Sequence, residues 1–347
     1  MHALLLQWVI VHTVAPRGVP RQYFSGPGTR SSYQVVKICF LAVASQVASC
    51  YLQRQWCGDD GAATVTNILS GHTLIDSLEI ADDALAEVSL ILEMRRNFSM
   101  SMYKDKCMKR RIAIRMRSCR CLDAAAYCNL LRQSEQELDL LKKTLTIHVS
   151  QFFRNPSMFE KLKAEILPAL FKLADAEGSD IRCFSLGCAG GEEAYSLAII
   201  LRENFAQESL HKRVMICAFD IDADILQAAA QGNYNDERLR DLPAGIRDRY
   251  FVQHASHLQL SVEIREMVKF HLLNIMDAGT LEPCHLAMCR NTLIYFTRPE
   301  QEKILHGIAN ILPPGGILVL GKSETLVGDV RRLFTTVCPV ERIYRRL

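Results

Sequence analysis

Three glycines and two glutamates stand together in the segment FSLGCAGGEEAYSLA. Gly187, Gly190 and Gly191 are followed at once by Glu192 and Glu193. Glycines let backbone approach a ligand closely, and the two carboxylates would repel a pyrophosphate but suit a ligand that carries an ammonium group. The spacing departs from the dinucleotide fingerprint G-x-G-x-x-G, which disfavours a nicotinamide cofactor. On this segment alone, an equal alternative is that the glutamates only stabilise the positive N-terminus of the next helix.

A second acidic position follows the next apolar run along the chain. Residues 214–219 read as a buried strand, and Asp220 and Asp222 come directly after it. An acidic side chain at that point can accept hydrogen bonds from both hydroxyls of a ribose. A ribose and an ammonium group without phosphate describe S-adenosylmethionine, which we therefore expect as the cofactor. An NAD-dependent enzyme is the disfavoured alternative, because the glycine spacing is wrong for it.

The elements that must position these residues alternate between strand and helix after Arg154. Short apolar runs occur at 181–186, 214–219, 268–273, 286–289 and 317–320, and helical patterns at 156–176, 191–204, 223–231 and 299–312. Such alternation predicts an open, mostly parallel sheet with helices on both faces. Ligands of these sheets bind at the carboxyl ends of the strands, which is where the glycine segment stands. The alternating tail, 334–345, is expected to close one edge of the sheet.

The region before this alternation is predicted to be a small helical domain, with helices at 81–97, 103–120, 122–133 and 135–144. The second helix has one apolar stripe, and its other faces are strongly basic. A basic face is most simply a solvated surface, and nucleic acid is the other default reading of such a patch. The net charge of the whole chain, +3 over 347 residues, is too small to argue for a nucleic-acid partner.

The thirteen cysteines include no C-x-x-C pair, and the chain is far longer than a disulfide-stapled scaffold. They are expected to be reduced thiols of a cytoplasmic protein. Cys119 and Cys121 are too close together for a zinc site, so no metal is predicted. Residues 1–75 contain an apolar run at 3–14, which no Lys or Arg precedes and which is therefore a poor signal peptide. A second apolar run, at 38–48, is too short to span a bilayer, so no stable membrane insertion is expected and a membrane anchor is the minority alternative. Residues 1–75 as a whole are expected to be either a poorly ordered extension or the result of a wrongly assigned start site.

Four segments in order, TLTIHVSQFFRNPSMFEKL, SLGCAGGEEAYSLAIIL, AFDIDADILQAAAQGNY and CRNTLIYFTRPEQEKIL, closely resemble the chemotaxis receptor methyltransferase (CheR) family. The family consists of S-adenosylmethionine-dependent protein-glutamate O-methyltransferases, and the resemblance runs from about Leu85 to Arg345. It implies an all-helical domain followed by a Rossmann-like α/β methyltransferase domain with a small β-subdomain. We expect these domains at 76–147 and 148–347, with the β-subdomain at about 250–270.

The resemblance also implies site residues. Positions that match cofactor contacts of the family are His148, Ser150, Arg154, Glu192, Asp220, Asn274, Ile275, Cys289, Arg290 and Asn291. His148 replaces the family's usual asparagine; a neutral imidazole can still donate one hydrogen bond, and the alternative is a linker histidine with no ligand role. Arg154 and Tyr295 match the pair nearest the methyl transfer and are the expected catalytic residues. A glutamate substrate is already a carboxylate at neutral pH and needs no general base.

The implied reaction transfers a methyl group to glutamates in the cytoplasmic helical region of methyl-accepting chemoreceptors, giving methyl esters and S-adenosylhomocysteine. The resemblance makes the basic helix the docking surface for that acidic partner, through Lys106, Lys109, Arg110, Arg111, Arg115 and Arg117. Nucleic acid is then not expected as a partner, and the protein is expected to be a monomer. The predicted β-subdomain lacks a glycine-containing hairpin loop, so we expect no tethering of a receptor pentapeptide. The alternative function is a non-catalytic S-adenosylmethionine-binding signalling scaffold.

Overall fold

The structure is a computed structural model that describes residues 80–146, 149–208 and 213–347. The expectations for residues 1–75 and for His148 therefore lie outside the described residues. In the described part, no helix is both long and apolar enough to cross a bilayer. All ten cysteines in that part are free thiols.

Four helices come first in the described chain, close to the predicted ranges: α4 (Asp82–Arg96), α5 (Asp105–Ser118), α6 (Ala124–Gln133) and α7 (Glu135–Leu145). Asn97 ends α4 in the left-handed conformation, with φ of 48°. The side chains of Asp123 and Ser134 accept hydrogen bonds from backbone N–H groups in the first turns of α6 and α7. These caps satisfy backbone N–H groups that the first turn of a helix leaves unpaired, and they allow α7 to begin directly after α6 ends.

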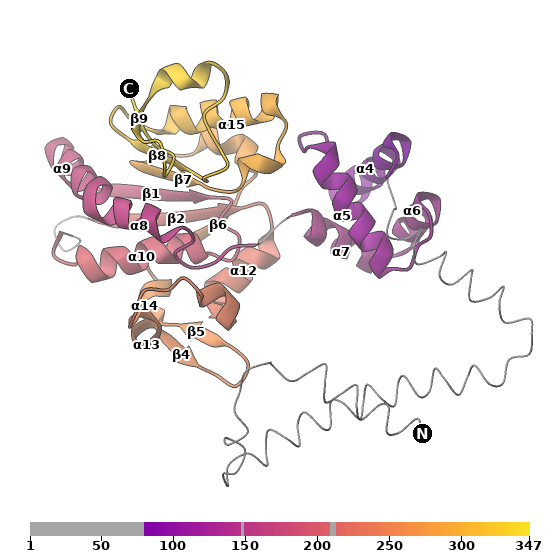
Figure 1. Cartoon of the computed structure of the whole chain (residues 1–347), viewed down its shortest axis with the longest axis horizontal. Coiled ribbons are helices and arrows are strands. Elements are labelled where there is room, and N and C mark those ends of the chain that lie inside the picture. The colour runs from indigo at the N-terminus through magenta and orange to yellow at the C-terminus, as the bar shows by residue number, and fades with distance from the viewer. Residues whose placement is uncertain (1–79, 147–148, 209–212) are drawn as a thin grey trace, which may run out of the picture. The chain divides into compact units, whose positions relative to one another are not determined.

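The main sheet has seven strands in the order β6-β2-β1-β7-β8-β10-β9 (Figure 1). Their bounds are β1 (Ile181–Leu186), β2 (Val214–Asp220), β6 (Val268–Leu272), β7 (Leu286–Cys289), β8 (Ile317–Leu320), β9 (Phe334–Cys338) and β10 (Ile343–Arg346). The first five strands of that order pair in parallel, and β10 is antiparallel to β8 and to β9. Leu186 pairs with Phe219 at the ends of β1 and β2, so both strands end at the same edge.

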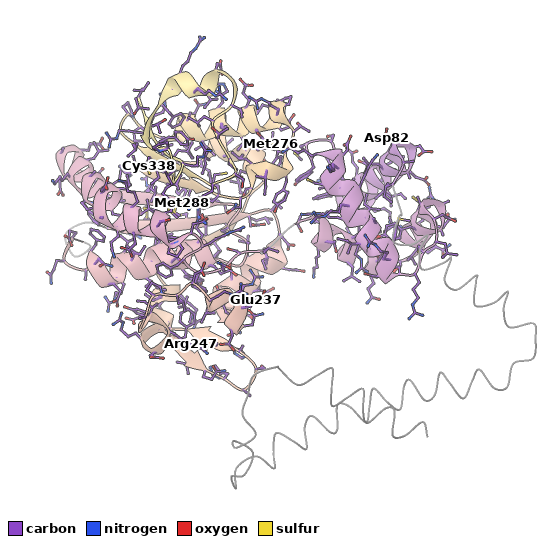
Figure 2. The ribbon with its side chains drawn as sticks, viewed as in Figure 1. Asp82, Glu237, Arg247, Met276, Met288 and Cys338 are labelled. Carbon is purple, nitrogen blue, oxygen red and sulfur yellow. The ribbon has the colours of Figure 1, made fainter. Side chains whose placement is uncertain are left out.

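Helices complete the α/β arrangement: α8 (Pro156–Lys161), α9 (Leu167–Glu177), α10 (Glu192–Asn204), α12 (Ala223–Gln231) and α15 (Arg298–Ile311). In β7, Leu286 and Met288 pack into the hydrophobic cluster that contains residues of α8, α9 and α10. Of these two residues, Met288 is labelled in Figure 2. Ala287 and Cys289 pack into the cluster that contains α15. Successive strand residues face opposite sides of a sheet, so the wholly apolar strands reflect burial on both faces.

One predicted helix, 156–176, is interrupted in the structure. The segment η2 (Leu162–Ile166) is a turn of π-helix between α8 and α9. Pro168 follows it in the first turn of α9. Because proline has no N–H to donate to the carbonyl four residues earlier, the regular hydrogen-bond ladder cannot continue through this point.

A second, antiparallel sheet has the order β3-β5-β4, with β3 (Asn233–Tyr234), β4 (Phe251–Gln253) and β5 (Leu258–Leu260). Three short helices accompany it: η3 (Asp236–Leu239), α13 (Ile246–Tyr250) and α14 (Val262–Arg265). The predicted range of about 250–270 differs from this arrangement at both ends. It leaves out β3, a strand of two residues without a periodic pattern, and it includes part of β6, which pairs with β2.

Candidate active site

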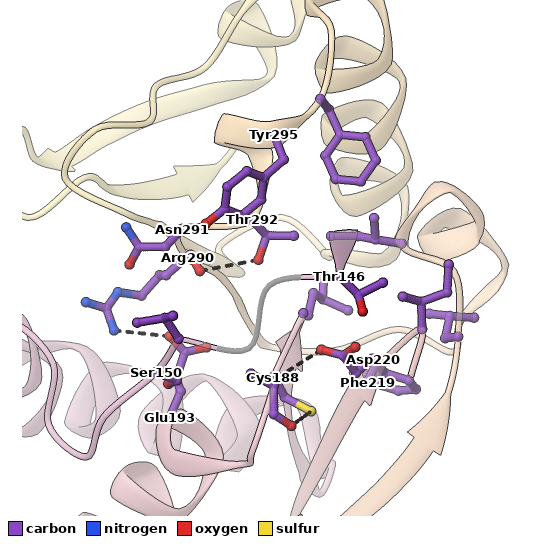
Figure 3. Close-up of a pocket in the computed structure, with 18 of the residues that line it drawn as sticks. Thr146, Ser150, Cys188, Glu193, Phe219, Asp220, Arg290, Asn291, Thr292 and Tyr295 are labelled. Carbon is purple, nitrogen blue, oxygen red and sulfur yellow. Dashed lines mark hydrogen bonds and ion pairs between the residues drawn. The ribbon is translucent and has the colours of Figure 1, made fainter. Parts of the chain in front are cut away.

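A cavity opens at the carboxyl ends of the parallel strands. Its empty space is about 1040 Å³, a figure that includes open solvent at its mouth. Its wall includes Leu186 at the end of β1, Phe219 and Asp220 at the end of β2, and Arg290 directly after β7. Figure 3 shows the labelled side chains around it. The position agrees with the sheet edge that the strand pattern indicated.

The glycine segment forms the floor of this cavity because it folds back tightly on β2. The N–H groups of Gly187 and Cys188 both donate to the carbonyl of Phe219, at 2.8 and 2.9 Å. Gly187 has φ of +75°, and a β-carbon there would collide with the side chain of Thr292. Gly191 has φ of +84°, and its β-carbon would lie 2.8 Å from the ring of Phe270. Both positions require glycine for conformation and for packing.

Asp220 joins the cavity to the glycine segment. Its side chain is 8% exposed and lines the cavity. Oδ2 accepts a hydrogen bond from the N–H of Ala189 at 2.8 Å, and Oδ1 accepts one from the N–H of Asp222 at 3.2 Å. These bonds fix the carboxylate at the strand end, where sequence reasoning placed it.

The two glutamates of the segment point to different surroundings. Glu193 lines the cavity, accepts a hydrogen bond from the hydroxyl of Ser185 at 2.8 Å and pairs with Arg290 at 3.1 Å. Glu192 is 1% exposed and pairs with Arg238 at 2.8 Å, and it is not among the residues that line the cavity. Sequence reasoning chose Glu192 for the cofactor, whereas the structure brings Glu193 to the cavity. Neighbouring helical residues point about 100° apart, and the motif alone does not say which one faces inward.

The linker between the helical region and α8 covers part of the cavity. Ser150 and Arg154, two of the residues expected to contact the cofactor, both line it. Nη1 of Arg238 donates to the carbonyl of Ser150 at 2.7 Å, and the N–H of Phe152 donates to the carbonyl of Arg238 at 2.8 Å. Nη2 of Arg290 donates to the carbonyl of Arg154 at 2.7 Å. Two arginines, each paired with one of the tandem glutamates, thus hold this linker by its backbone.

The segments after β6 and β7 supply the rest of the predicted set. Asn274 and Ile275 line the cavity, and Oδ1 of Asn274 accepts a hydrogen bond from the N–H of Met276 at 3.1 Å. Arg290 and Asn291 line it as well. Cys289 is fully buried and does not line the cavity.

Tyr295 lines the cavity from η5 (Leu293–Tyr295). Burial raises the pKa of its hydroxyl, and the positive charges of Arg111 and Arg154 act in the opposite direction. The phenol is therefore a hydrogen-bond donor at neutral pH. The backbone of this segment is held by the helical region, because the N–H of Lys104 donates to the carbonyl of Tyr295 at 2.9 Å.

The six cations predicted to dock a partner fall into two groups. Lys106, Arg110 and Arg117 are exposed on α5. The other three make contacts within the protein: Lys109 pairs with Asp82 at 2.5 Å, Arg115 pairs with Glu137 at 2.6 Å, and Arg111 is buried. Nη1 of Arg111 donates to the carbonyls of Thr144 and Leu145 at the end of α7. The first three are the exposed ones, and among them Nε of Arg117 also donates to the carbonyl of Ala113 at 3.3 Å.

Several cavity residues were not among the predicted site residues, namely Thr146, Gln151, Cys188, Glu193, Phe219 and Thr292, although the sequence already offered Glu193 with Glu192 as a carboxylate for an ammonium group. Glu193 and Thr292 adjoin predicted residues, so their motifs were visible but not their orientation. Burial, with nearby Asp220 and Glu193, raises the pKa of the Cys188 thiol well above its ordinary value, so this thiol is not a nucleophile.

Away from the cavity wall, Glu302, His306 and Asp329 bring three ligand-type atoms within 4.8 Å of one another, with His306 and Asp329 hydrogen-bonded at 2.7 Å.

Comparison with known proteins supplies a family for this arrangement. Residues 148–341 match the model of the CheR methyltransferase SAM binding domain, and residues 83–146 match that of the CheR methyltransferase all-alpha domain. A chemotaxis protein methyltransferase of Borreliella burgdorferi is 29% identical over 260 residues, 73% of this chain and 92% of that protein. Chemotaxis protein methyltransferase 2 of Pseudomonas aeruginosa is 32% identical over 238 residues, 66% and 81% of the two chains.

A longer relative matches the same region. An uncharacterised 104.1 kDa protein of Rhodobacter capsulatus is 33% identical over 272 residues, which is 78% of this chain. The aligned region spans only 28% of that protein's length.

Proposed function

This chain belongs to the CheR methyltransferase family, and we propose that it transfers the methyl group of S-adenosylmethionine to glutamate side chains of methyl-accepting chemoreceptors. The products are glutamate methyl esters and S-adenosylhomocysteine. The observation that carries the proposal is one cavity at the strand ends that is lined by Asp220, Glu193, Arg154 and Tyr295 together. The receptor region concerned is helical and cytoplasmic, so the enzyme would act in the cytoplasm. A single copy of the chain holds all these residues, and the proposal needs no second subunit.

The cavity residues suit different parts of the cofactor. Asp220 can accept hydrogen bonds from the ribose hydroxyls, and Asn274 and Ile275 stand where the adenine would lie. Glu193 offers a carboxylate to the ammonium group of the methionine end, and it takes the place first given to Glu192. A cation next to a carboxylate in a partly enclosed site is favourable because solvent screening is weak there. The contact expected of His148 remains a prediction.

The transfer itself needs little from the protein. A carboxylate oxygen of the substrate attacks the methyl carbon, the carbon–sulfur bond breaks, and its electron pair stays on sulfur, which becomes neutral. No proton moves, so no general base is required. Catalysis is then mainly the alignment of oxygen, carbon and sulfur away from water. Arg154 can orient the carboxylate by a charge-assisted hydrogen bond, and Tyr295 can donate a second one.

Docking of the receptor is assigned to the exposed cations of α5. Lys106, Arg110 and Arg117 can steer an acidic helical surface toward the cavity, because unpaired surface charges act over about 10 Å at moderate ionic strength. This reduces the predicted docking set from six residues to three. Arg111, Arg115 and Lys109 are given structural roles by their contacts.

The first test is calorimetric titration of S-adenosylhomocysteine into the purified protein, with Asp220→Ala and with NAD as controls. Binding that is lost in the variant and absent for NAD is the expected result. The second test mixes the protein and labelled S-adenosylmethionine with purified cytoplasmic fragments of chemoreceptors. Base-labile label on glutamates supports the proposal. Binding of the cofactor without label on any fragment would favour the non-catalytic scaffold.

A further inference from the structure

Glu324 is a buried carboxylate that the proposed reaction does not use directly. It follows β8, is 4% exposed and does not line the cavity. Burial raises its pKa, and hydrogen bonds from backbone N–H groups act in the opposite direction. A buried carboxylate is costly unless its oxygens are satisfied, so the groups that satisfy it indicate why it is there.

Those groups belong to the segment that carries the reaction residues. Oε2 of Glu324 accepts a hydrogen bond from the N–H of Asn291 at 2.8 Å, and Oε1 accepts one from the N–H of Ile294 at 3.2 Å. Oε2 also accepts one from the N–H of Gly321 at 2.7 Å. The carboxylate therefore joins the turn after β8 to the backbone between Arg290 and Tyr295.

The segment from Arg290 to Tyr295 has a conformation that needs such support. Asn291 has φ of +59°, the left-handed region that a residue with a side chain seldom adopts. Gly321 lets the turn after β8 lie close to the 290–295 segment. A β-carbon at this position would lie 2.7 Å from Oε2 of Glu324 and 2.8 Å from the nitrogen of Asn291. Four residues of the segment, Arg290, Asn291, Thr292 and Tyr295, line the cavity.

We infer that Glu324 is a positioning residue, which fixes the 290–295 segment so that Tyr295 and its neighbours face the reacting atoms. This inference rests on the proposed function. Hydrogen bonds from backbone N–H groups to an ionised carboxylate are stronger than those to a neutral acceptor. Misplacement of reacting groups by about 1 Å can lower a rate about 100-fold. One carboxylate just after β8 thus determines the geometry of a segment that lies about thirty residues earlier in the chain.

The test compares the wild type with Glu324→Gln, Gly321→Ala and a control, Glu341→Gln. Glu341 is similarly buried, at 7%, but its Oε1 accepts from the side chain of Ser157 and pairs with Lys322 at 3.5 Å. Hydrogen–deuterium exchange of residues 290–295 is measured first, with no receptor present. In Glu324→Gln one acceptor oxygen is replaced by an amide NH2 group, and in Gly321→Ala the added β-carbon displaces the carboxylate. In each variant at least one of the amides of Asn291 and Ile294 is therefore expected to exchange at least about tenfold faster, whereas both are expected to be unchanged in Glu341→Gln.

The second measurement is kcat for methyl transfer to a receptor fragment, together with Kd for S-adenosylhomocysteine. We expect kcat to fall about 10- to 100-fold in Glu324→Gln, while Kd rises no more than about threefold because Asp220 and Glu193 are untouched. Unchanged exchange, or unchanged kcat in folded protein, would overturn the inference. A wild type that methylates no fragment would instead refute the proposed function, and the exchange experiment would still decide whether Glu324 holds the segment.

Discussion

The guanidinium carbon of Arg111 lies 5.1 Å from the centre of the Tyr295 ring. Arg111 belongs to α5 of the helical region, whereas Tyr295 lines the cavity of the α/β region. The arginine is 9% exposed, and burial lowers the pKa of its guanidinium below the ordinary value. It remains charged at neutral pH. The helical region therefore contributes to the active site itself, in addition to any role in docking.

This contact predicts different effects for two neighbouring arginines. Arg111→Ala should lower kcat about tenfold, since a cation–π contact contributes roughly 0.5–2 kcal/mol and holds the tyrosine ring. Arg110→Ala should raise KM for the receptor and leave kcat unchanged, because Arg110 is exposed. Steady-state kinetics at low and high salt separate the two. If both variants change only KM, the interpretation of Arg111 fails.

Arg154 is predicted to act on the methyl-accepting carboxylate more than on the cofactor. Arg154→Ala should lower kcat about 100-fold, the scale of losing an electrostatic contact in a transition state, while Kd for S-adenosylhomocysteine rises only slightly. Single-turnover methylation and calorimetry on the same preparation measure both quantities. Equal kcat in the variant and the wild type would contradict the assignment.

The two glutamates after the glycines should behave oppositely when each is made neutral. Glu193→Gln should weaken binding of S-adenosylhomocysteine about tenfold, because its carboxylate faces the cavity. Glu192→Gln should mainly lower the free energy of unfolding, by about 1–3 kcal/mol, because it removes the buried negative charge that pairs with Arg238. Arg238 is 30% exposed, which reduces the cost. Calorimetric binding and chemical denaturation of both variants check this difference. If only Glu192→Gln bound the cofactor weakly, the roles assigned to the two glutamates would be reversed.

The helical region should lose stability in acid through Glu137. Burial tends to raise the pKa of this carboxyl, but hydrogen bonds from Arg115 and Tyr127 outweigh it and leave the pKa below its ordinary value of 4.5. A depressed folded-state pKa stabilises the protein above the unfolded value and loses this contribution as pH falls through the folded value. Thermal unfolding between about pH 3 and pH 7 should show this loss in the wild type. Glu137→Gln should be less stable at neutral pH and less sensitive to acid.

The sequence predicted the five parallel strands and the longer helices well, because each has its own apolar run or period. The short strands β3, β4 and β5 and the short helices α13 and α14 were not predicted. The cavity position followed from the strand order, since the glycine segment and Asp220 both stand at carboxyl ends. The π-helical turn before Pro168 was not predicted, because an amphipathic pattern continues through it.

The orientation of individual charged side chains was not predictable in the same way. Arg110 and Arg111 are neighbours in one basic run, and only packing against Tyr295 and the end of α7 decides that the second turns inward. Glu192 and Glu193 differ for the same reason, because their partners Arg238 and Arg290 come from distant parts of the chain. Sequence spacing indicates which residues are near a site, whereas tertiary contacts decide which of them face it.

The hold of Arg238 on the linker has a consequence for chimeric enzymes. Arg238 directly follows Asp236 and Glu237 in η3, within the chain that builds the small sheet, yet its side chain and carbonyl bond the backbone at Ser150 and Phe152. A graft that exchanges residues 233–265 between two members of this family must therefore keep an arginine at position 238, because the linker groups that it contacts are backbone groups. Where the donor sequence lacks an arginine at this position, the graft would fold its small sheet correctly and still leave the cavity wall loose.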